Sequence, residues 1–206
     1  MGHVMRLLLF AGFLGSGKTT LILSLAKRAA ESGLRICVIV NEIGEVGIDG
    51  EVLRMGDLEV KELTAGCICC QIGPDLVRTL RELEEQFQPD LVIVEASGIA
   101  TPAGVMDALQ HYPVASVTGT RTVTVVDATR FEALHEVLTP LIESQITGAD
   151  VLVITKADEA TATEVDDTVR AVGLLAPMLP VHVVDATAGE SLAALLTDLV
   201  PEEVGA

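Results

Sequence analysis

The stretch GFLGSGKTT, residues 12–20, decides the fold that this sequence predicts. Its glycine-x4-glycine-lysine-threonine spacing is typical of a phosphate-binding P-loop. The apolar run RLLLFA (6–11) predicts a strand before the loop, and residues 18–32 predict a helix after it. Because a P-loop needs this strand–loop–helix setting, we expect a nucleoside triphosphate to bind here. A chance glycine-rich turn is the weaker alternative.

The residues of this loop have separate expected roles. The glycines let backbone N–H groups wrap the phosphates without side-chain clashes, and the helix N-terminus adds its positive dipole end. We expect Lys18 to neutralise the β- and γ-phosphates, Thr19 to ligate Mg²⁺ and Thr20 to contact the α-phosphate. The expected nucleotide-binding residues of the loop are Gly12, Gly15, Ser16, Gly17, Lys18, Thr19 and Thr20.

Strand-like and helix-like stretches alternate along the rest of the chain. Strand-like runs occupy residues 6–11, 35–40, 58–63, 90–95, 122–127, 150–155 and 181–186. Helix-like stretches occupy residues 18–32, 74–87, 102–110, 129–147, 159–172 and 189–199. Asp75 and Thr129 suit helix starts, and Gly33 suits a helix end. Pro140 is expected to break its helix. The pattern predicts one α/β domain over residues 1–206, a P-loop NTPase with a mostly parallel central sheet and helices on both faces.

Two further segments have the character of nucleotide-sensing switches. LVIVEASG (91–98) ends an apolar strand, so Glu95 could hold Mg²⁺ or a bridging water and Gly98 could offer its N–H to the γ-phosphate. NEIGEVGIDGE (41–51) is glycine-rich and acidic, and Glu42 could contact Mg²⁺, the attacking water or a transferred metal. An ordinary solvated loop is the alternative for both. The expected catalytic residues are Lys18, Glu42 and Glu95.

The segment TKAD (155–158) carries the signal for the nucleotide base. The Asp158 carboxylate can accept hydrogen bonds from N1–H and N2–H₂ of guanine, which adenine does not offer. The aliphatic stem of Lys156 can lie along the base. GTP is therefore favoured over ATP, with Thr155 and the backbone of Ala186 as further expected contacts.

Three of the four cysteines, Cys67, Cys69 and Cys70, lie within four residues. Three close thiols are soft ligands for a transition metal such as Zn²⁺, Co²⁺, Ni²⁺ or Cu(I). None of the four scattered histidines can be assigned as a fourth ligand, which indicates a transient site that hands a metal on. Partly buried thiols in a tight loop, or a redox switch between Cys67 and Cys70, are the alternatives. The fourth cysteine, Cys37, is interpreted as a small core residue.

A formal net charge of −17 argues against nucleic acid and anionic membranes as partners. The apolar beginning of the chain has some features of a signal peptide, but it is short and runs directly into the P-loop. No stretch approaches the ~20 apolar residues of a membrane span. We therefore expect a cytoplasmic protein.

Taken in order, GFLGSGKTT, NEIGEVGIDG, GCICC, EASGIATP and TKAD resemble the motifs of the CobW-type GTPases, which form one family with the HypB and UreG metallochaperones. The resemblance covers about residues 5–200. It implies a GTPase that binds a transition metal at its CxCC thiols and couples metal delivery to GTP hydrolysis. By position it gives Lys18 and Thr19 the phosphate and Mg²⁺ roles and Glu42 and Glu95 the switch roles. It also allows a homodimer that closes over the nucleotide.

Two departures from the family pattern bear on function. Thr155 replaces the asparagine of the usual NKxD motif and lacks the amide that bridges toward the P-loop. We therefore expect guanine preference to persist through Asp158 with weaker affinity. CobW-type proteins usually carry a further C-terminal domain of about a hundred residues, which this sequence does not include, so a client is expected to be recognised by the GTPase surface or by another subunit.

The leading hypothesis is a GTP-dependent chaperone for a transition metal, most simply Zn²⁺, or for a metallocofactor. Its client would be a metalloenzyme or a cobalamin-dependent (corrinoid) protein. A small-molecule kinase is one alternative, although the sequence offers no clear acceptor pocket or catalytic base for it. A nucleotide-dependent thiol redox sensor is the other.

Overall fold

The computed structural model of the protein describes residues 4–40, 53–55, 58–62, 72–111, 114, 116–185 and 189–201. Its strands are β1 (Met5–Ala11), β2 (Ile36–Val40), β3 (Leu53–Met55), β4 (Leu58–Glu62), β5 (Leu91–Glu95), β6 (Val117–Asp127), β7 (Val151–Thr155) and β8 (Val181–Val183). Its helices are α1 (Lys18–Glu31), α2 (Ile72–Phe87), α3 (Pro102–His111), α4 (Phe131–Thr147), α5 (Ala162–Leu175) and α6 (Gly189–Leu199).

The strands form one eight-stranded sheet in the order β3-β4-β2-β5-β1-β6-β7-β8. Every pair of neighbours is parallel except the edge pair β3 and β4. The predicted mostly parallel sheet is confirmed. Strand β1 lies between β5 and β6, so the loop that follows β1 emerges between the ends of two other strands. Ligands of open α/β sheets bind at this kind of position.

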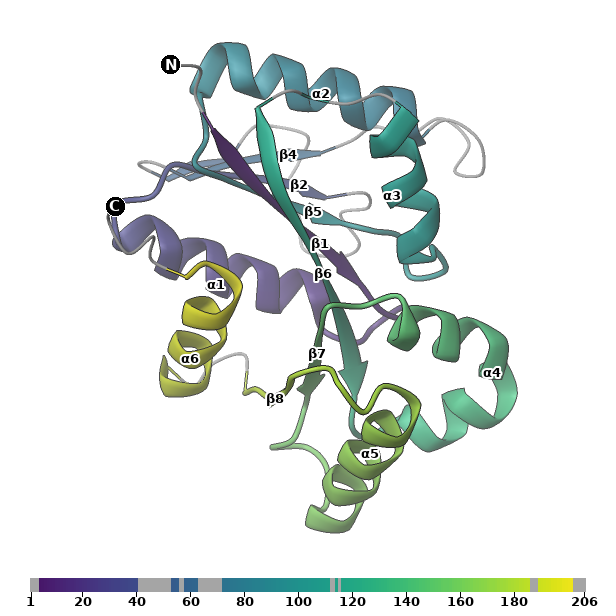
Figure 1. Cartoon of the computed structure of the whole chain (residues 1–206). Coiled ribbons are helices and arrows are strands. Elements are labelled where there is room, and N and C mark those ends of the chain that lie inside the picture. Colours follow the sequence, from purple (N-terminus) through teal and green to yellow (C-terminus); the bar gives the residue numbers. More distant parts are fainter. Residues whose placement is uncertain are drawn as a thin grey trace.

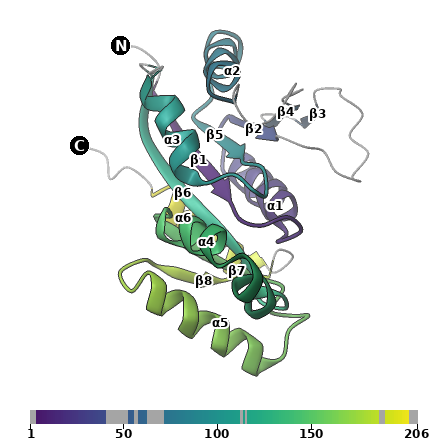
Figure 2. The same cartoon turned by 90° about the vertical axis from the view of Figure 1, so that its right-hand side faces the viewer.

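Helices cover both faces of the sheet, as predicted (Figure 1). Helices α1 and α6 pack on one face, against β1, β2 and β5–β7. Helices α2 and α3 pack on the other face of β1, β2 and β5, and α4 and α5 continue that layer over β6 and β7. Figure 2 shows α5 at the end of the molecule away from α2.

Strand β1 shows why the apolar runs are nearly continuous. Leu8 and Phe10 face the α1 side, whereas Leu7 and Leu9 face the α2 side, and all four are buried. Since successive strand residues point to opposite faces, a strand covered on both sides needs apolar residues at every position. Burying one such side chain contributes about 1.5–3 kcal/mol to the stability of the folded state. The P-loop therefore follows directly from the well-packed centre of the sheet.

Some element boundaries differ from the predicted ones. Strand β6 begins at Val117 instead of residue 122, because its polar first half pairs with β1 through the backbone and carries no apolar signal. Strand β8 ends at Val183 instead of residue 186; as an edge strand it is paired only with β7. The three-residue strand β3 was not predicted.

Three predicted helix starts were wrong. Helix α2 begins at Ile72, so Asp75 lies inside it. Helix α4 begins at Phe131, because Thr129 donates to the Asp127 carboxylate instead of capping the helix. Helix α5 begins three residues later than predicted, since Thr161 acts as its N-cap. Short polar side chains can bond to turns as well as to helix ends, and sequence does not separate the two.

Two predicted helix features are confirmed. Gly33 follows α1 with a φ of 92°, a left-handed conformation that glycine adopts without steric cost. Helix α4 is kinked two residues before Pro140, where Leu138 leaves helical geometry with φ −122° and ψ 31°. Among the described residues, no helix is both long and apolar enough to cross a membrane.

Candidate nucleotide-binding site

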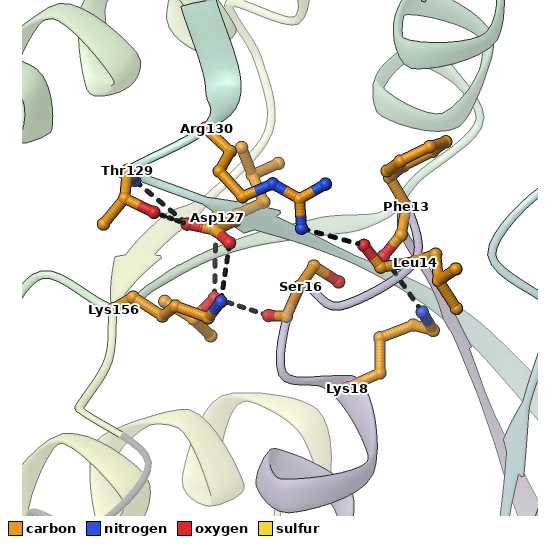
Figure 3. Close-up of polar contacts among 10 residues, drawn as sticks. Phe13, Leu14, Ser16, Lys18, Asp127, Thr129, Arg130 and Lys156 are labelled. Atoms are coloured by element: carbon orange, nitrogen blue, oxygen red, sulfur yellow. Dashed lines mark hydrogen bonds and ion pairs between the residues drawn. The ribbon is translucent and has the colours of Figure 1, made fainter. Parts of the chain in front are cut away.

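The P-loop joins β1 to α1 and lies at the carboxyl edge of the sheet (Figure 3). The segments predicted to sense the γ-phosphate and to read the base follow β5 and β7 at the same edge. The fold therefore gathers on one edge three predicted segments that lie between residues 12 and 158 of the sequence.

Glycines hold the backbone of the P-loop in conformations that other residues rarely adopt. Gly12, Gly15 and Gly17 have φ values of 135°, 75° and 83°. A Cβ atom at Gly12 would also lie 2.2 Å from the carbonyl oxygen of Val125 in β6. The loop can pass this close to β6 only because Gly12 has no side chain.

The Phe13 carbonyl oxygen accepts two donors from within the P-loop. The Lys18 ammonium group lies 3.2 Å from this oxygen (Figure 3). The backbone nitrogen of Ser16 also lies 3.2 Å from it. Lys18 is only 5% exposed, so its charge is held inside the loop where a phosphate would enter. The Ser16 hydroxyl is also buried and is one of the side-chain groups without a hydrogen-bond partner among the described residues.

Thr19 and Glu95 meet at the end of β5. The Thr19 hydroxyl lies 2.9 and 3.0 Å from the two carboxylate oxygens of Glu95, and the Glu95 residue is 8% exposed. These two residues are 76 positions apart in the sequence. Hydroxyl and carboxylate oxygens are the hard ligands that Mg²⁺ prefers. The donor set of this structure therefore fits the magnesium site that the sequence predicted.

Gly98 lies directly against the P-loop. A Cβ atom there would be 2.6 Å from the backbone nitrogen of Leu14. On its other side the Gly98 carbonyl oxygen accepts a hydrogen bond from Gln145 of α4. Sequence reasoning missed Gln145, because a glutamine inside a helix carries no motif signal.

Thr155 makes a contact that the sequence did not predict. Its hydroxyl lies 2.7 Å from the Ser16 carbonyl oxygen and 3.2 Å from that of Val126. The asparagine amide of the usual motif is absent here, and the hydroxyl that threonine retains makes a bridge to the P-loop in its place. The hydroxyl makes the bridge at close range because Thr155, at the end of β7, is 2% exposed and packed beneath the loop.

The loop predicted to read the base is bound to β6 by a partly buried ion pair. The Lys156 ammonium group lies 2.7 Å from the carboxylate of Asp127, whose side chain is 1% exposed (Figure 3). Asp127 also accepts hydrogen bonds from the backbone and hydroxyl of Thr129. Sequence reasoning did not single out Asp127, although it ends an apolar strand as Glu95 does. Asp158 is exposed at the beginning of the following loop, open to a ligand.

Arg130 is a second cation at the P-loop that the sequence did not predict. Its guanidinium donates to the Leu14 carbonyl oxygen at 3.3 Å and lies 6.0 Å from the centre of the Phe13 ring (Figure 3). Arg130 is the N-cap residue of α4 and is exposed. The positive side chain of Arg130, from the loop between β6 and α4, therefore lies against the exposed tip of the P-loop, although the protein as a whole is strongly acidic.

The remaining predicted site residues lie outside the described residues. They are Glu42, Cys67, Cys69, Cys70 and Ala186. Within the described ranges, no group of three or more His, Cys, Asp and Glu side chains is arranged to hold a metal ion. The predicted thiol site therefore remains a prediction from the sequence.

The chain also matches a known protein family along most of its length. A family model described as CobW/HypB/UreG, nucleotide-binding domain, matches residues 6–183. The chain belongs to this family. The predicted resemblance and the α/β P-loop fold are thereby confirmed.

Curated relatives of the family are similar over most of this chain. A zinc chaperone CobW from a Sinorhizobium species is 38% identical over 176 residues, which are 71% of this chain and 49% of that protein. The zinc chaperone YeiR from Escherichia coli K12 is 34% identical over 155 residues, 74% of this chain and 47% of the relative. The chain therefore spans about half the length of these two relatives.

Solved structures of family members share the fold. HypB from Archaeoglobus fulgidus, a hydrogenase maturation factor, superimposes with a TM-score of 0.68 at 16% identity, over 95% of this chain and 88% of that one. The Zn(II)-bound YjiA GTPase from Escherichia coli superimposes with a TM-score of 0.63 at 22% identity, over 91% of this chain and 58% of that one. At these identities the likeness supports the fold alone.

Proposed function

We propose that this protein binds and hydrolyses GTP and couples its nucleotide state to the binding and delivery of a transition metal. The observation that carries the nucleotide part is the Thr19–Glu95 pair beside the buried Lys18. A buried cation, a hydroxyl and a carboxylate converge at a glycine-rich helix N-terminus, which is the arrangement that a triphosphate with Mg²⁺ requires. Residues 1–206 would form one such nucleotide-binding domain.

The chain's own residues would divide the work of hydrolysis. Lys18 and the P-loop N–H groups would hold the phosphates, while Thr19 and Glu95 would hold Mg²⁺, which neutralises charge on the β- and γ-phosphates when it is bound. Gly98 would offer its N–H to the γ-phosphate from the other side. Glu42 would act on the attacking water or on Mg²⁺.

Guanine selection would depend on Asp158. Its carboxylate would accept hydrogen bonds from the base, and Lys156, anchored to Asp127, would place its stem along the ring. Thr155 and the backbone of Ala186 would complete the site. The direct bond from Thr155 to Ser16 supports a base-reading loop that is firmly joined to the P-loop.

The metal part of the proposal rests on the Cys67, Cys69 and Cys70 cluster of the sequence and on the zinc chaperones among the relatives. We propose Zn²⁺ as the cargo, with Co²⁺ and Ni²⁺ as the competing ions, and a metalloenzyme or corrinoid protein in the cytoplasm as the client. A homodimer would be the form that closes over the nucleotide. Nucleic acid and membranes are not proposed as partners, given the net charge of −17.

The experiment measures Zn²⁺ affinity of the purified protein with Mg²⁺ and either a non-hydrolysable GTP analogue or GDP. We expect affinities that differ between the two states, and a loss of Zn²⁺ binding in Cys69→Ala. The matched control is Cys37→Ala, which removes a buried thiol of β2 that is not one of the three clustered cysteines. Equal Zn²⁺ affinities in the two states would remove the coupling. Release of phosphate from GTP without any acceptor would count against the kinase alternative.

A further inference from the structure

Helix α4 reaches the loop between β5 and α3 through one buried side chain. The Gln145 amide nitrogen donates to the carbonyl oxygens of Gly98 at 3.2 Å and Ala100 at 3.0 Å. Gln145 is 1% exposed. One amide group therefore uses both of its hydrogens on two carbonyls that are two residues apart.

The segment that Gln145 holds is a tight turn, residues 97–100. The Ala100 N–H donates to the Ser97 carbonyl oxygen at 2.9 Å, which closes the turn. The preceding residue, Ala96, is fixed to β1 by a 2.8 Å hydrogen bond from its N–H to the Phe10 carbonyl oxygen. The 97–100 turn is thus anchored at its beginning by the sheet and along its length by Gln145.

The other side of the 97–100 turn faces the P-loop. Gly98 approaches Leu14 so closely that a Cβ atom would lie 2.6 Å from the Leu14 nitrogen. The turn is therefore held between the P-loop on one side and Gln145 on the other.

The anchor behind Gln145 is rigid. Its backbone carbonyl accepts a 2.7 Å hydrogen bond from the Thr124 hydroxyl of β6, and Thr124 is 1% exposed. The neighbouring Ile146 is fully buried in the core between α4, β6 and β7. The backbone of α4 at Gln145 is therefore fixed to the sheet, which gives its side-chain amide a defined position beside the turn.

We propose that Gln145 is a positioning residue for the γ-phosphate: its two hydrogen bonds hold the 97–100 turn where the Gly98 N–H can bind the third phosphate of GTP. This inference rests on the proposed role of Gly98 in GTP binding. GDP lacks the phosphate that the turn would contact. Loss of the Gln145 amide therefore weakens binding of the triphosphate and leaves binding of the diphosphate nearly unchanged.

The test is Gln145→Met, which keeps the length of the side chain and removes both N–H donors. Affinities for a non-hydrolysable GTP analogue and for GDP, each with Mg²⁺, are measured by calorimetry. We expect about a tenfold loss for the GTP analogue, the size of one to two neutral hydrogen bonds, and less than about a twofold change for GDP. Gln145→Asn keeps the donors on a shorter side chain and should lie between the wild type and Gln145→Met.

The matched control is Thr147→Ala, which removes an exposed side-chain hydrogen bond of the same helix, to the Glu143 carbonyl oxygen, and touches neither Gln145 nor the turn. We expect it to leave the ratio of GTP-analogue to GDP affinity unchanged. Equal losses for both nucleotides in Gln145→Met, or an altered ratio in Thr147→Ala, would overturn the positioning role. If Gln145→Met does not fold, an unchanged ratio in Gln145→Asn overturns it. A wild-type protein that binds no GTP analogue would instead reject the proposed function itself.

Discussion

Two helices, α1 and α5, begin at the same edge of the sheet, and their N-termini differ in backbone conformation, capping and charge. Helix α1 begins after Gly17, in a left-handed conformation with φ 83° and ψ 15° and no side-chain cap. Helix α5 begins after Thr161, in an extended conformation with φ −72° and ψ 155°. The side chain of Thr161 accepts from the Glu164 N–H, and the Glu164 carboxylate accepts from the Thr161 N–H. Helix α5 therefore supplies side-chain acceptors for N–H groups of its first turn. Helix α1 has no side-chain cap, so the N–H groups of its first turn are left for another acceptor.

Charge and burial show the same contrast. The first turn of α1 has no acidic residue and begins with the buried Lys18, whereas α5 places Glu164 in its first turn at the surface. A positive charge is unfavourable at a helix N-terminus unless an anion joins it. The N-terminus of α1 is therefore suited to bind an anionic ligand, whereas that of α5 is capped by its own side chains.

The largest expected effect comes from Lys18→Ala. Removing the buried cation should lower the affinity for GTP and GDP at least about a hundredfold, because a charged partner of the phosphates is lost. The melting temperature of the nucleotide-free protein should hardly change. Calorimetric titration and thermal unfolding measure the two quantities. Retained nucleotide affinity would mean that the phosphates do not bind at the N-terminus of α1.

Thr155→Val tests whether the bond from the end of β7 to the P-loop contributes to nucleotide affinity. The variant keeps the shape of the side chain and removes its hydrogen bond to the Ser16 carbonyl oxygen. We expect GTP and GDP affinities to fall together by about fivefold, the value of one neutral hydrogen bond. This parallel loss differs from the GTP-specific loss expected for Gln145→Met. Unchanged affinities for both nucleotides would show that the bridge is only structural.

Thr161→Ala removes the side-chain half of the α5 cap. The free energy of unfolding should fall by about 1 kcal/mol, as is typical for loss of an N-cap threonine. Urea unfolding measures this loss. Nucleotide affinity should stay as in the wild type, and a reduced affinity would mean that α5 takes part in the ligand site.

The smallest expected effect is the pH dependence of the same cap. The hydrogen bond from the Thr161 backbone N–H, followed by that from its hydroxyl, lowers the pKa of Glu164 below its ordinary value. The carboxylate therefore stabilises the folded state above the pKa of the unfolded state, and this contribution disappears as pH falls through the lower folded pKa. The difference in melting temperature between wild type and Glu164→Gln should shrink below about pH 4.5. A difference that persists in acid would contradict a charged cap.

Much of the fold could be predicted from periodicity. In the part of the chain that the structure describes, all six helices and seven of the eight strands lie where apolar patterns indicated them. The errors fall where the backbone, and not the side chains, makes the contacts, as in the polar first half of β6. Short polar residues account for the wrong starts of α4 and α5, since Thr129 bonds to Asp127 while Thr161 caps a helix.

The candidate site divides in the same way. Local motifs predicted Lys18, Thr19, Glu95 and Gly98 as site residues, because the chemistry of a phosphate loop has a strict spacing. Gln145 has no such spacing and could not be predicted, since its proposed role depends on which loop lies beside α4. The contact of Thr155 with Ser16 was not predicted, because a hydroxyl reaches a carbonyl only if the fold brings the end of β7 and the P-loop close enough.

The sequence by itself determined that this chain is an α/β P-loop protein of the CobW/HypB/UreG family, because nearest-neighbour patterns and loop spacing encode strands, helices and the phosphate loop. The tertiary structure decided which side chains meet at that loop. The pairs Thr19–Glu95, Thr155–Ser16, Lys156–Asp127 and Gln145–Gly98 join residues 29 to 139 positions apart. Distances this short across such separations follow only from strand order and helix packing, which no local pattern specifies.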